Sequence, residues 1–172
     1  MPAPGNAQPR SAMLTACAAG LRISEVVDLQ ITDIRADRRL LHIRSGKGGT
    51  GRMASLPPGM VEHLRRYWTS LCPRPKTWLF DGSSPDVPIK AATLRRAFNA
   101  TRDRAGIDQG TSCHALRHSA AAHWHERGGS IDVIQDALGH RNSDTTRACA
   151  RATGKMFEAL NRPVSGFSLL NA

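Results

Sequence analysis

Residues 112–127 read SCHALRHSAAAHWHER, and this stretch indicates an α-helix that carries two neighbouring cationic side chains. Alanine and leucine favour the helical state, and Gly128-Gly129 supplies a stop signal directly after the run. His114 and Arg117 are three residues apart, so they lie on one face of the predicted helix. The stretch therefore predicts a helix that presents an imidazole next to a guanidinium.

Helical signals recur on both sides of this stretch, and one segment has the pattern of a β-hairpin. Further helices are expected at residues 11–19, 24–29, 60–71, 90–105, 130–138 and 144–151. Residues 40–44 and 52–56 are short extended runs around the glycine-rich connection SGKGGTG, which is typical of a hairpin. The sequence therefore predicts a mainly α fold with a small antiparallel β-sheet, in the α+β class.

The length of the chain predicts a single domain after a short lead-in. Domains have roughly 100–200 residues, and this chain has 172. Residues 1–10 are rich in proline, so we expect them to be flexible, with Ser11 as the N-cap of the first helix. Residues 11–172 are then expected to form the domain.

Basic residues dominate the charge of the chain. Lys and Arg number 24 against 14 Asp and Glu, a formal net charge of +10, which favours a polyanionic partner. Aromatic residues make up only 5%, fewer than single-stranded nucleic-acid binders normally use for stacking. No run approaches the ~18 apolar residues of a membrane span, and the first residues do not resemble a secretory leader. We therefore expect a cytoplasmic protein with no membrane partner.

The four cysteines show no pattern of a metal site or of a disulfide framework. They lie at positions 17, 72, 113 and 149, and no Cys-x-x-Cys pair is present. A chain of this length without a secretory leader is expected to keep its thiols reduced. Cys17, Cys72 and Cys113 are predicted to be small core residues, whereas Cys149 belongs to the last predicted helix.

Five cationic or protonatable side chains lie near helix ends and turns in widely separated segments. They are Arg22, Lys47, His114, Arg117 and His140. Arginine binds two phosphate oxygens at once, and histidine and lysine transfer protons near neutral pH. No cluster of carboxylates that would hold a metal ion accompanies them. The set therefore predicts a site that holds a phosphodiester by direct hydrogen bonds, with no metal and no cofactor.

Four stretches of the sequence, taken in order, resemble one known family. They are AAGLRISEVVDLQITDI, the hairpin SGKGGTGR, HALRHSAAAHWHERG and IDVIQDALGHRNSDTTRACAR, and they span about residues 14–151. The combination resembles the catalytic domain of the tyrosine recombinases, also called the phage-integrase family. The resemblance implies a site-specific DNA recombinase, with a fold and a mechanism shared with type IB topoisomerases.

The resemblance assigns roles to three residues in the N-terminal part of the chain. Arg22, in Gly-Leu-Arg-Ile-Ser-Glu, resembles the first catalytic arginine of the family. Glu25 resembles the acidic residue that braces this motif. Lys47 occupies the place of the hairpin lysine, which the family uses as the general acid toward the leaving 5′ oxygen.

Three residues in the C-terminal part also match the family. His114 and Arg117 match the His-x-x-Arg motif, in which the arginine is the second phosphate clamp and the histidine assists proton transfer. His140, in Leu-Gly-His, resembles the later position whose side chain packs on the phosphate and hydrogen-bonds it.

The chain departs from the family at the nucleophile, a tyrosine that follows the Leu-Gly-His histidine by nine residues. Here that position is Cys149, and the only tyrosine, Tyr67, lies far from any matching motif. A cysteine sulfur lies roughly 2.8 Å from its Cα, and a tyrosine oxygen roughly 6.5 Å. Because a misplacement of about 1 Å can cost ~100-fold in rate, we expect this chain to hold the phosphate but to cleave slowly or not at all.

The resemblance also implies a partner and an assembly. Family members cut and rejoin double-stranded DNA through a covalent 3′-phosphotyrosyl link, usually as tetramers on paired sites. They also have a separate N-terminal core-binding domain, for which this sequence has no counterpart, so residues 11–172 are expected to be a catalytic domain alone. Such a domain would be associated with the nucleoid.

One other function fits part of the sequence, and a second does not. Residues 130–151 fit a helix–turn–helix with Arg147 and Arg151 on its second helix, which would make the chain a non-catalytic DNA-binding regulator. A metal-dependent nuclease would need acidic residues clustered near histidine, and the aspartates of this region are spread out.

Another predicted helix carries four arginines, which form either a phosphate-contacting face or a merely solvated one. They are Arg95, Arg96, Arg102 and Arg104.

Overall fold

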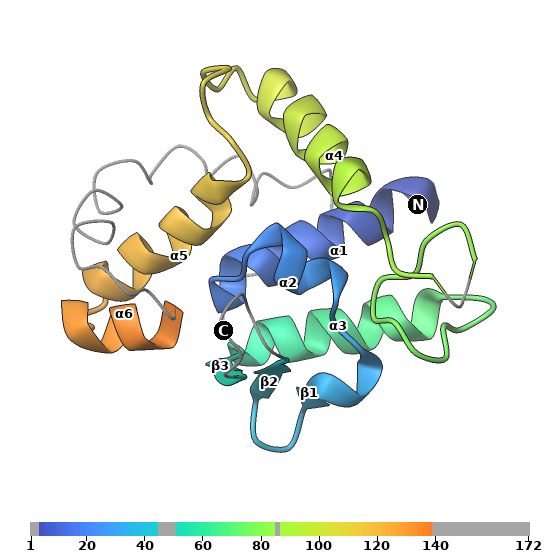
Figure 1. Cartoon of the computed structure of the whole chain (residues 1–172), viewed down its shortest axis with the longest axis horizontal. Helices are drawn as coiled ribbons and strands as arrows, with labels where there is room; N and C mark the ends of the chain where they lie inside the picture. Colours follow the sequence, from blue (N-terminus) through green and yellow to red (C-terminus); the bar gives the residue numbers. More distant parts are fainter. Residues whose placement is uncertain (1–3, 45–50, 85–86, 139–172) are drawn as a thin grey trace.

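Six α-helices, one 3-10 helix and three short strands make up the part of the chain that the structure describes (Figure 1). The structure is a computed structural model, and it describes residues 4–44, 51–84 and 87–138. The elements in chain order are α1 (Pro4–Ala19), α2 (Ile23–Val27), η1 (Ile31–Asp33), β1 (Ile34–Arg35), β2 (Leu40–Ile43), β3 (Arg52–Ser55), α3 (Pro58–Ser70), α4 (Ala91–Arg104), α5 (His114–Glu126) and α6 (Ile131–Leu138). The helix predicted at 144–151 lies outside the described residues. None of the described helices is long and apolar enough to cross a bilayer.

The three strands form one antiparallel sheet in the order β1-β2-β3, which confirms the predicted fold class. In the predicted hairpin, β2 pairs with β3 from Leu40↔Ser55 to Ile43↔Arg52. Leu41 and Ile43 are buried and alternate with less buried neighbours, as in a sheet with one covered face. The sequence did not predict β1, because a strand of two residues is too short to show a pattern.

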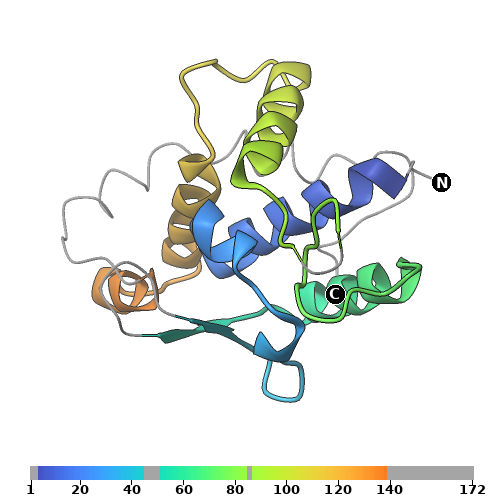
Figure 2. The same ribbon diagram turned by 45° about the vertical axis from the view of Figure 1, so that its right-hand side comes forward.

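Helix α1 contacts α2, α3, α4 and α5, and Figures 1 and 2 show it in the middle of the helical part. Ala12 and Ala16 of α1 are fully buried, and their small side chains let the neighbouring helices pack closely. A second, smaller core joins α5 to α6 through Ala121, Ile134 and Leu138. Since α6 also contacts β3, the C-terminal part of the described chain lies against the hairpin.

The flexible lead-in predicted over residues 1–10 is wrong for its described part, because α1 begins at Pro4. Proline is tolerated in the first turn of a helix, but Pro9 lies further inside and removes one backbone hydrogen bond. A tertiary contact offsets this loss. The Gln8 side-chain amide donates to the main-chain and carboxylate oxygens of Asp81 at 2.7 and 2.6 Å.

The described cysteines lie in three different environments. Cys17 is buried on α1, and this burial raises the pKa of its thiol to about 12. Cys113 is half-buried, whereas Cys72 is exposed, so the core position predicted for Cys72 is wrong. Cys72 follows the end of α3, where the chain leaves the helix and continues as a surface loop.

Helix α3 packs on α1 through a histidine whose environment predicts acid-sensitive folding. His63 Nε2 lies 3.0 Å from the hydroxyl of Ser11, a residue predicted as an N-cap and found inside α1. Burial first, and then the charges of Arg10 and Arg66, lower the pKa of His63 from 6.5 to about 4. The unfolded chain therefore binds this proton at higher pH than the folded chain, so stability falls as the pH drops from 6.5 towards 4.

We expect His63→Gln to remove this part of the pH dependence. Urea unfolding at about pH 7 and about pH 5 should show a loss on the order of 1–2 kcal/mol for the wild type that the variant lacks. An equal loss of stability in the wild type and in His63→Gln would contradict the prediction.

Candidate functional site

The junction between α1 and α2 depends on a glycine that allows several elements to meet. Gly20 has a φ of +63°, a left-handed conformation that favours glycine. A Cβ at this position would lie 2.5 Å from Leu138 Cδ2 of α6 and 3.1 Å from the ring of Trp124 on α5. The missing side chain therefore lets α5 and α6 approach the start of α2, next to Arg22.

The buried carboxylate of Glu25 lies at the centre of the site. Its side chain is 4% exposed and belongs to the first turn of α2, where a negative charge suits the helix dipole. The backbone N–H of Arg22 donates to Glu25 Oε2 at 2.8 Å, and Nη1 of Arg22 donates to Oε1 at 3.2 Å. This contact is local, because residues three apart adjoin at the start of a helix.

Arg52, at the start of β3, also binds this carboxylate. Its Nη1 donates to Glu25 Oε1 at 2.7 Å and its Nη2 donates to Oε2 at 3.0 Å. Its Nε donates to the carbonyl of Ala137 near the end of α6, at 3.1 Å. Sequence reasoning missed this residue. The only available signal was an arginine directly after the glycine-rich connection of the hairpin.

Arg117 reaches the same carboxylate from α5. Its side chain is 6% exposed, and its Nη1 lies 3.8 Å from Glu25 Oε2. Nη1 also donates to the carbonyl of Gly20 at 2.7 Å, and Nη2 donates to the carbonyl of Leu138. Arg22 and Arg117 therefore meet at one carboxylate, although they are far apart in the sequence, Arg22 at the N-cap of α2 and Arg117 within α5.

The cluster of Arg22, Arg52, Arg117 and Glu25 is positively charged. Three guanidiniums and one carboxylate sum to +2 for these four side chains. Burial raises the pKa of Glu25, but the hydrogen bonds from Arg52 and from the Arg22 N–H, with the charges of Arg52 and Arg117, outweigh burial and lower the pKa below its ordinary value. Glu25 stays ionised, and the surplus charge favours an anion beside Arg22, the most exposed of the three arginines.

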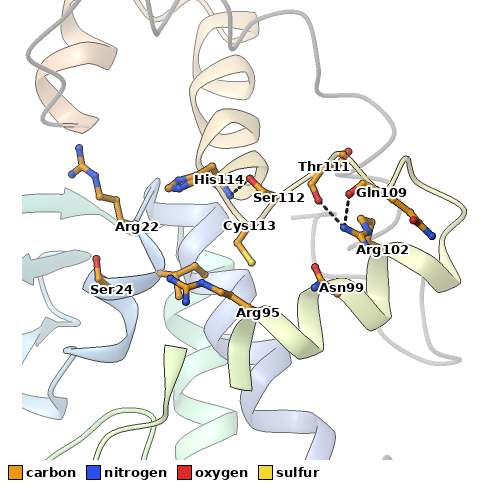
Figure 3. Close-up of a pocket in the computed structure, with 12 residues that line it drawn as sticks. Arg22, Ser24, Arg95, Asn99, Arg102, Gln109, Thr111, Ser112, Cys113 and His114 are labelled. Atoms are coloured by element: carbon orange, nitrogen blue, oxygen red, sulfur yellow. Dashed lines mark hydrogen bonds between the residues drawn. The ribbon is translucent and has the colours of Figure 1, made fainter. Parts of the chain in front are cut away.

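An open groove with a volume of about 470 Å³ extends from Arg22 to α4. Figure 3 shows Arg22, directly before α2, and the exposed His114 at the first turn of α5 on one side, with Arg95 and Arg102 along α4. Arg102 donates through Nη1 to two carbonyls of the loop that follows α4, at 2.8 and 3.1 Å, so it stabilises the groove wall. The groove thus presents cationic and polar groups from three elements.

The predicted site residues divide into those that the structure describes and those that it does not. Arg22 and Arg117 meet at Glu25, and His114 lines the groove beside Arg22. Three residues lie outside the described part of the chain: Lys47, His140 and Cys149. The second helix of the alternative helix–turn–helix lies outside it too. Among the described residues, no group of three or more His, Cys, Asp or Glu side chains could hold a metal ion.

The only tyrosine of the chain is part of the core. Tyr67 lies on α3, is 4% exposed, and has its ring centroid 5.6 Å from that of Phe80. Burial, with a smaller contribution from the charge of Asp81, raises the pKa of Tyr67 to about 12. A nucleophile must present its oxygen to the substrate, so the buried Tyr67 does not fit that role.

The helical fold, the small sheet and the arginine cluster define a class of protein, the catalytic domain of the tyrosine-recombinase type. Comparison with known proteins agrees with this class. The chain belongs to the Phage integrase family, whose family model matches residues 2–155.

Curated relatives match this chain over most of its length. A Sinorhizobium fredii protein named as an integrase/recombinase, y4qK, is 41% identical over 160 residues, which cover 88% of this chain and 51% of that protein. A tyrosine recombinase of Pseudothermotoga lettingae is 33% identical over 144 residues, which cover 83% of this chain and 49% of that protein. The chain therefore spans about half the length of these relatives.

Solved recombinase structures share the fold. The crystal structure of XerA recombinase has a TM-score of 0.70 and 26% identity, and the match covers 92% of this chain and 62% of that chain. The XerH site-specific recombinase bound to its difH substrate has a TM-score of 0.71 and 22% identity, over 88% of this chain and 45% of that chain. The architecture that holds the arginine cluster is thus the recombinase catalytic fold.

Proposed function

We propose that this chain is the catalytic domain of a site-specific recombinase and that its arginine cluster holds one backbone phosphate of double-stranded DNA. The observation that carries the proposal is the meeting of Arg22 and Arg117 at the carboxylate of Glu25. An exposed arginine next to buried arginines from other elements suits a phosphodiester, since its guanidinium can bind two phosphate oxygens and the buried charges add positive potential.

The arginines of the cluster have different tasks in this proposal. Arg22 is 42% exposed, so its guanidinium has donors that face solvent and can reach a phosphate. Arg52 and Arg117 are largely buried, and they hold the cluster together and add positive potential. This potential stabilises the negative charge that builds up on a pentavalent phosphorus in the transition state.

Three other residues supply proton transfer and hydrogen bonds. His114 is exposed beside Arg22 and assists proton transfer. By family resemblance, Lys47 protonates the leaving 5′ oxygen and His140 hydrogen-bonds the phosphate. These groups need no metal and no cofactor, because the phosphodiester is exchanged for a covalent protein–phosphate ester and its energy is kept for rejoining.

The nucleophile position determines how far this reaction proceeds. In the family pattern a tyrosine oxygen attacks the phosphorus, forms a 3′-phosphotyrosyl bond and releases the 5′ oxygen. At Cys149 the sulfur falls ~3–4 Å short of that oxygen, by the difference in side-chain length. As it stands, the chain is therefore proposed to bind DNA and hold the phosphate, and to cleave slowly or not at all.

The DNA partner is carried over from similar proteins. The XerH structure contains its difH substrate, and the structures of the Tn1549 transposon integrase contain transposon end DNA or circular intermediate DNA. We propose double-stranded DNA as the partner of this chain as well, with tetramers on paired sites at the nucleoid.

Removing Arg22 tests the proposal. We expect Arg22→Ala to weaken binding to duplex DNA about 10-fold and to reduce the salt dependence of binding by about one phosphate contact. Fluorescence anisotropy with a labelled duplex of random sequence, at several salt concentrations, measures both quantities.

Arg38→Ala is the matched control, because it removes the same charge from a side chain that is 78% exposed on the turn between β1 and β2. We expect it to change the affinity less than about 2-fold. Equal effects of Arg22→Ala and Arg38→Ala would contradict the proposal and favour the non-catalytic regulator, which has no need of Arg22.

A further inference from the structure

We propose that Arg52 is a positioning residue of this site, which orients the carboxylate of Glu25 and, through it, the guanidinium of Arg22. The inference rests on the proposed function, because Arg22 is the group that would hold the phosphate. Arg52 is outside the set of residues that the motifs assign to the reaction, and its contacts carry the inference.

Each nitrogen of the Arg52 guanidinium is bound within the protein. Nη1 and Nη2 donate to the two oxygens of Glu25 at 2.7 and 3.0 Å, and Nε donates to the carbonyl of Ala137 at 3.1 Å. The side chain is only 18% exposed. Arg52 is therefore occupied with the carboxylate and with the end of α6, and it has little surface left to offer to DNA.

The contacts of Glu25 show why Arg52 sets its orientation. Oε1 accepts from Arg52 at 2.7 Å and from the Arg22 side chain at 3.2 Å, so the bond to Arg52 is the shorter one. The two-oxygen contact with Arg52 fixes the plane of the carboxylate, since a guanidinium and a carboxylate pair in one plane. The Arg22 side chain donates to the same Oε1, so the direction of its guanidinium follows the plane that Arg52 imposes on the carboxylate.

Arg52 also links this carboxylate to α6. Its Nε binds the carbonyl of Ala137, and Arg117, which lies 3.8 Å from Glu25, binds the carbonyl of Leu138. Two arginines that meet at Glu25 thus both bind the last turn of α6. The positions of β3, α5 and α6 relative to Arg22 are therefore coupled through one carboxylate.

The variant Arg52→Lys separates the effect of the positive charge at position 52 from the effect of its hydrogen-bond geometry. Its ammonium keeps the positive charge, but it is a single compact donor group and cannot hold both Glu25 oxygens and the Ala137 carbonyl at once. If charge alone matters, Arg52→Lys behaves like the wild type. If Arg52 positions Arg22, the lysine variant loses that effect.

A double-mutant cycle that measures DNA affinity tests the positioning role of Arg52. In the wild-type background, Arg22→Ala should weaken binding of a random-sequence duplex about 10-fold. In the Arg52→Lys background it should weaken binding less than about 3-fold, because the Arg22 guanidinium is no longer oriented toward the phosphate. A purely structural role of Arg52 does not change what Arg22 contributes. Thermal unfolding of each variant checks that it is folded. If Arg52→Lys does not fold, the cycle is repeated with Arg52→Gln in its place.

Arg44→Lys is the control. Arg44 follows β2 of the same hairpin and donates through Nε to the buried Asp33 at 2.6 Å, a comparable pair that does not include Glu25. In this background Arg22→Ala should still cost about 10-fold. An equal cost of Arg22→Ala in wild type and Arg52→Lys overturns the positioning role and leaves the proposed function intact. If Arg22→Ala has no cost in the wild type, both proposals are overturned.

Discussion

Replacing Cys149 with tyrosine is expected to increase covalent attachment of this chain to duplex DNA by at least about 100-fold. The tyrosine oxygen extends ~3–4 Å further from the backbone than the cysteine sulfur, so it makes up the shortfall in reach at this position. The product would be a 3′-phosphotyrosyl ester with a free 5′ hydroxyl. Incubation with a randomised duplex library, followed by a denaturing gel, detects this ester without knowledge of the target sequence.

Two control variants isolate the tyrosine oxygen in this experiment. Cys149→Phe restores the ring without the hydroxyl and should show no attachment. Arg22→Ala in the tyrosine variant should reduce attachment about 100-fold, because the phosphate would lose its exposed clamp. Attachment that does not rise in Cys149→Tyr, while DNA binding is retained, would contradict the assignment of position 149 as the nucleophile.

Replacing Glu25 with alanine is expected to lower the free energy of unfolding by about 3–5 kcal/mol. The carboxylate is 4% exposed and has three guanidiniums within 4 Å, so its removal leaves the charges of the largely buried Arg52 and Arg117 uncompensated. Urea unfolding at neutral pH measures the change. Glu25→Gln, which keeps the shape and removes the charge, provides a second variant if the alanine variant does not fold.

An exposed glutamate provides the matched control for this prediction. Glu62 on α3 is 54% exposed and lies 3.9 Å from Arg65 and from Arg66, so Glu62→Ala should change stability by less than about 0.5 kcal/mol. A loss below about 1 kcal/mol for Glu25→Ala would contradict a central role of this carboxylate.

The pH dependence of stability checks the same residue independently. The pKa of Glu25 is lowered in the folded chain, so its contribution is present above the ordinary carboxyl pKa and is lost as the pH falls through the lowered value. The difference between the wild type and Glu25→Gln should therefore shrink on acidification. If the difference in stability between the wild type and Glu25→Gln stays constant down to about pH 2, the charge of Glu25 is not the cause of that difference.

Much of the secondary structure could be predicted because its signals are local. The hairpin around the glycine-rich connection, the helix after the double proline and the helix that carries His114 and Arg117 all depend on neighbouring residues. The first helix was misjudged for the same reason. Pro9 indicates a helix break when it is considered alone, and the contact from Gln8 to Asp81, far along the chain, makes a longer helix stable.

Part of the candidate site could also be predicted from local sequence, namely the pairing of Arg22 with Glu25 three residues later. The role of Arg52 could not be predicted, since nothing in the residues around it indicates a carboxylate in α2. The burial of Arg117 could not be predicted either, because an arginine on an amphipathic helix normally faces solvent.

The sequence by itself determined the class of fold, the family and the identity of the residue at position 149. Periodicity, turn chemistry and motif order depend only on the order of residues along the chain. The tertiary structure alone decided that Arg22, Arg52 and Arg117 share one buried carboxylate, and that the carbonyl groups at the end of α6 bind two of these arginines. The physical reason is that a buried charge is stable only where distant segments bring it partners, and those segments meet only when the helices and the sheet have packed.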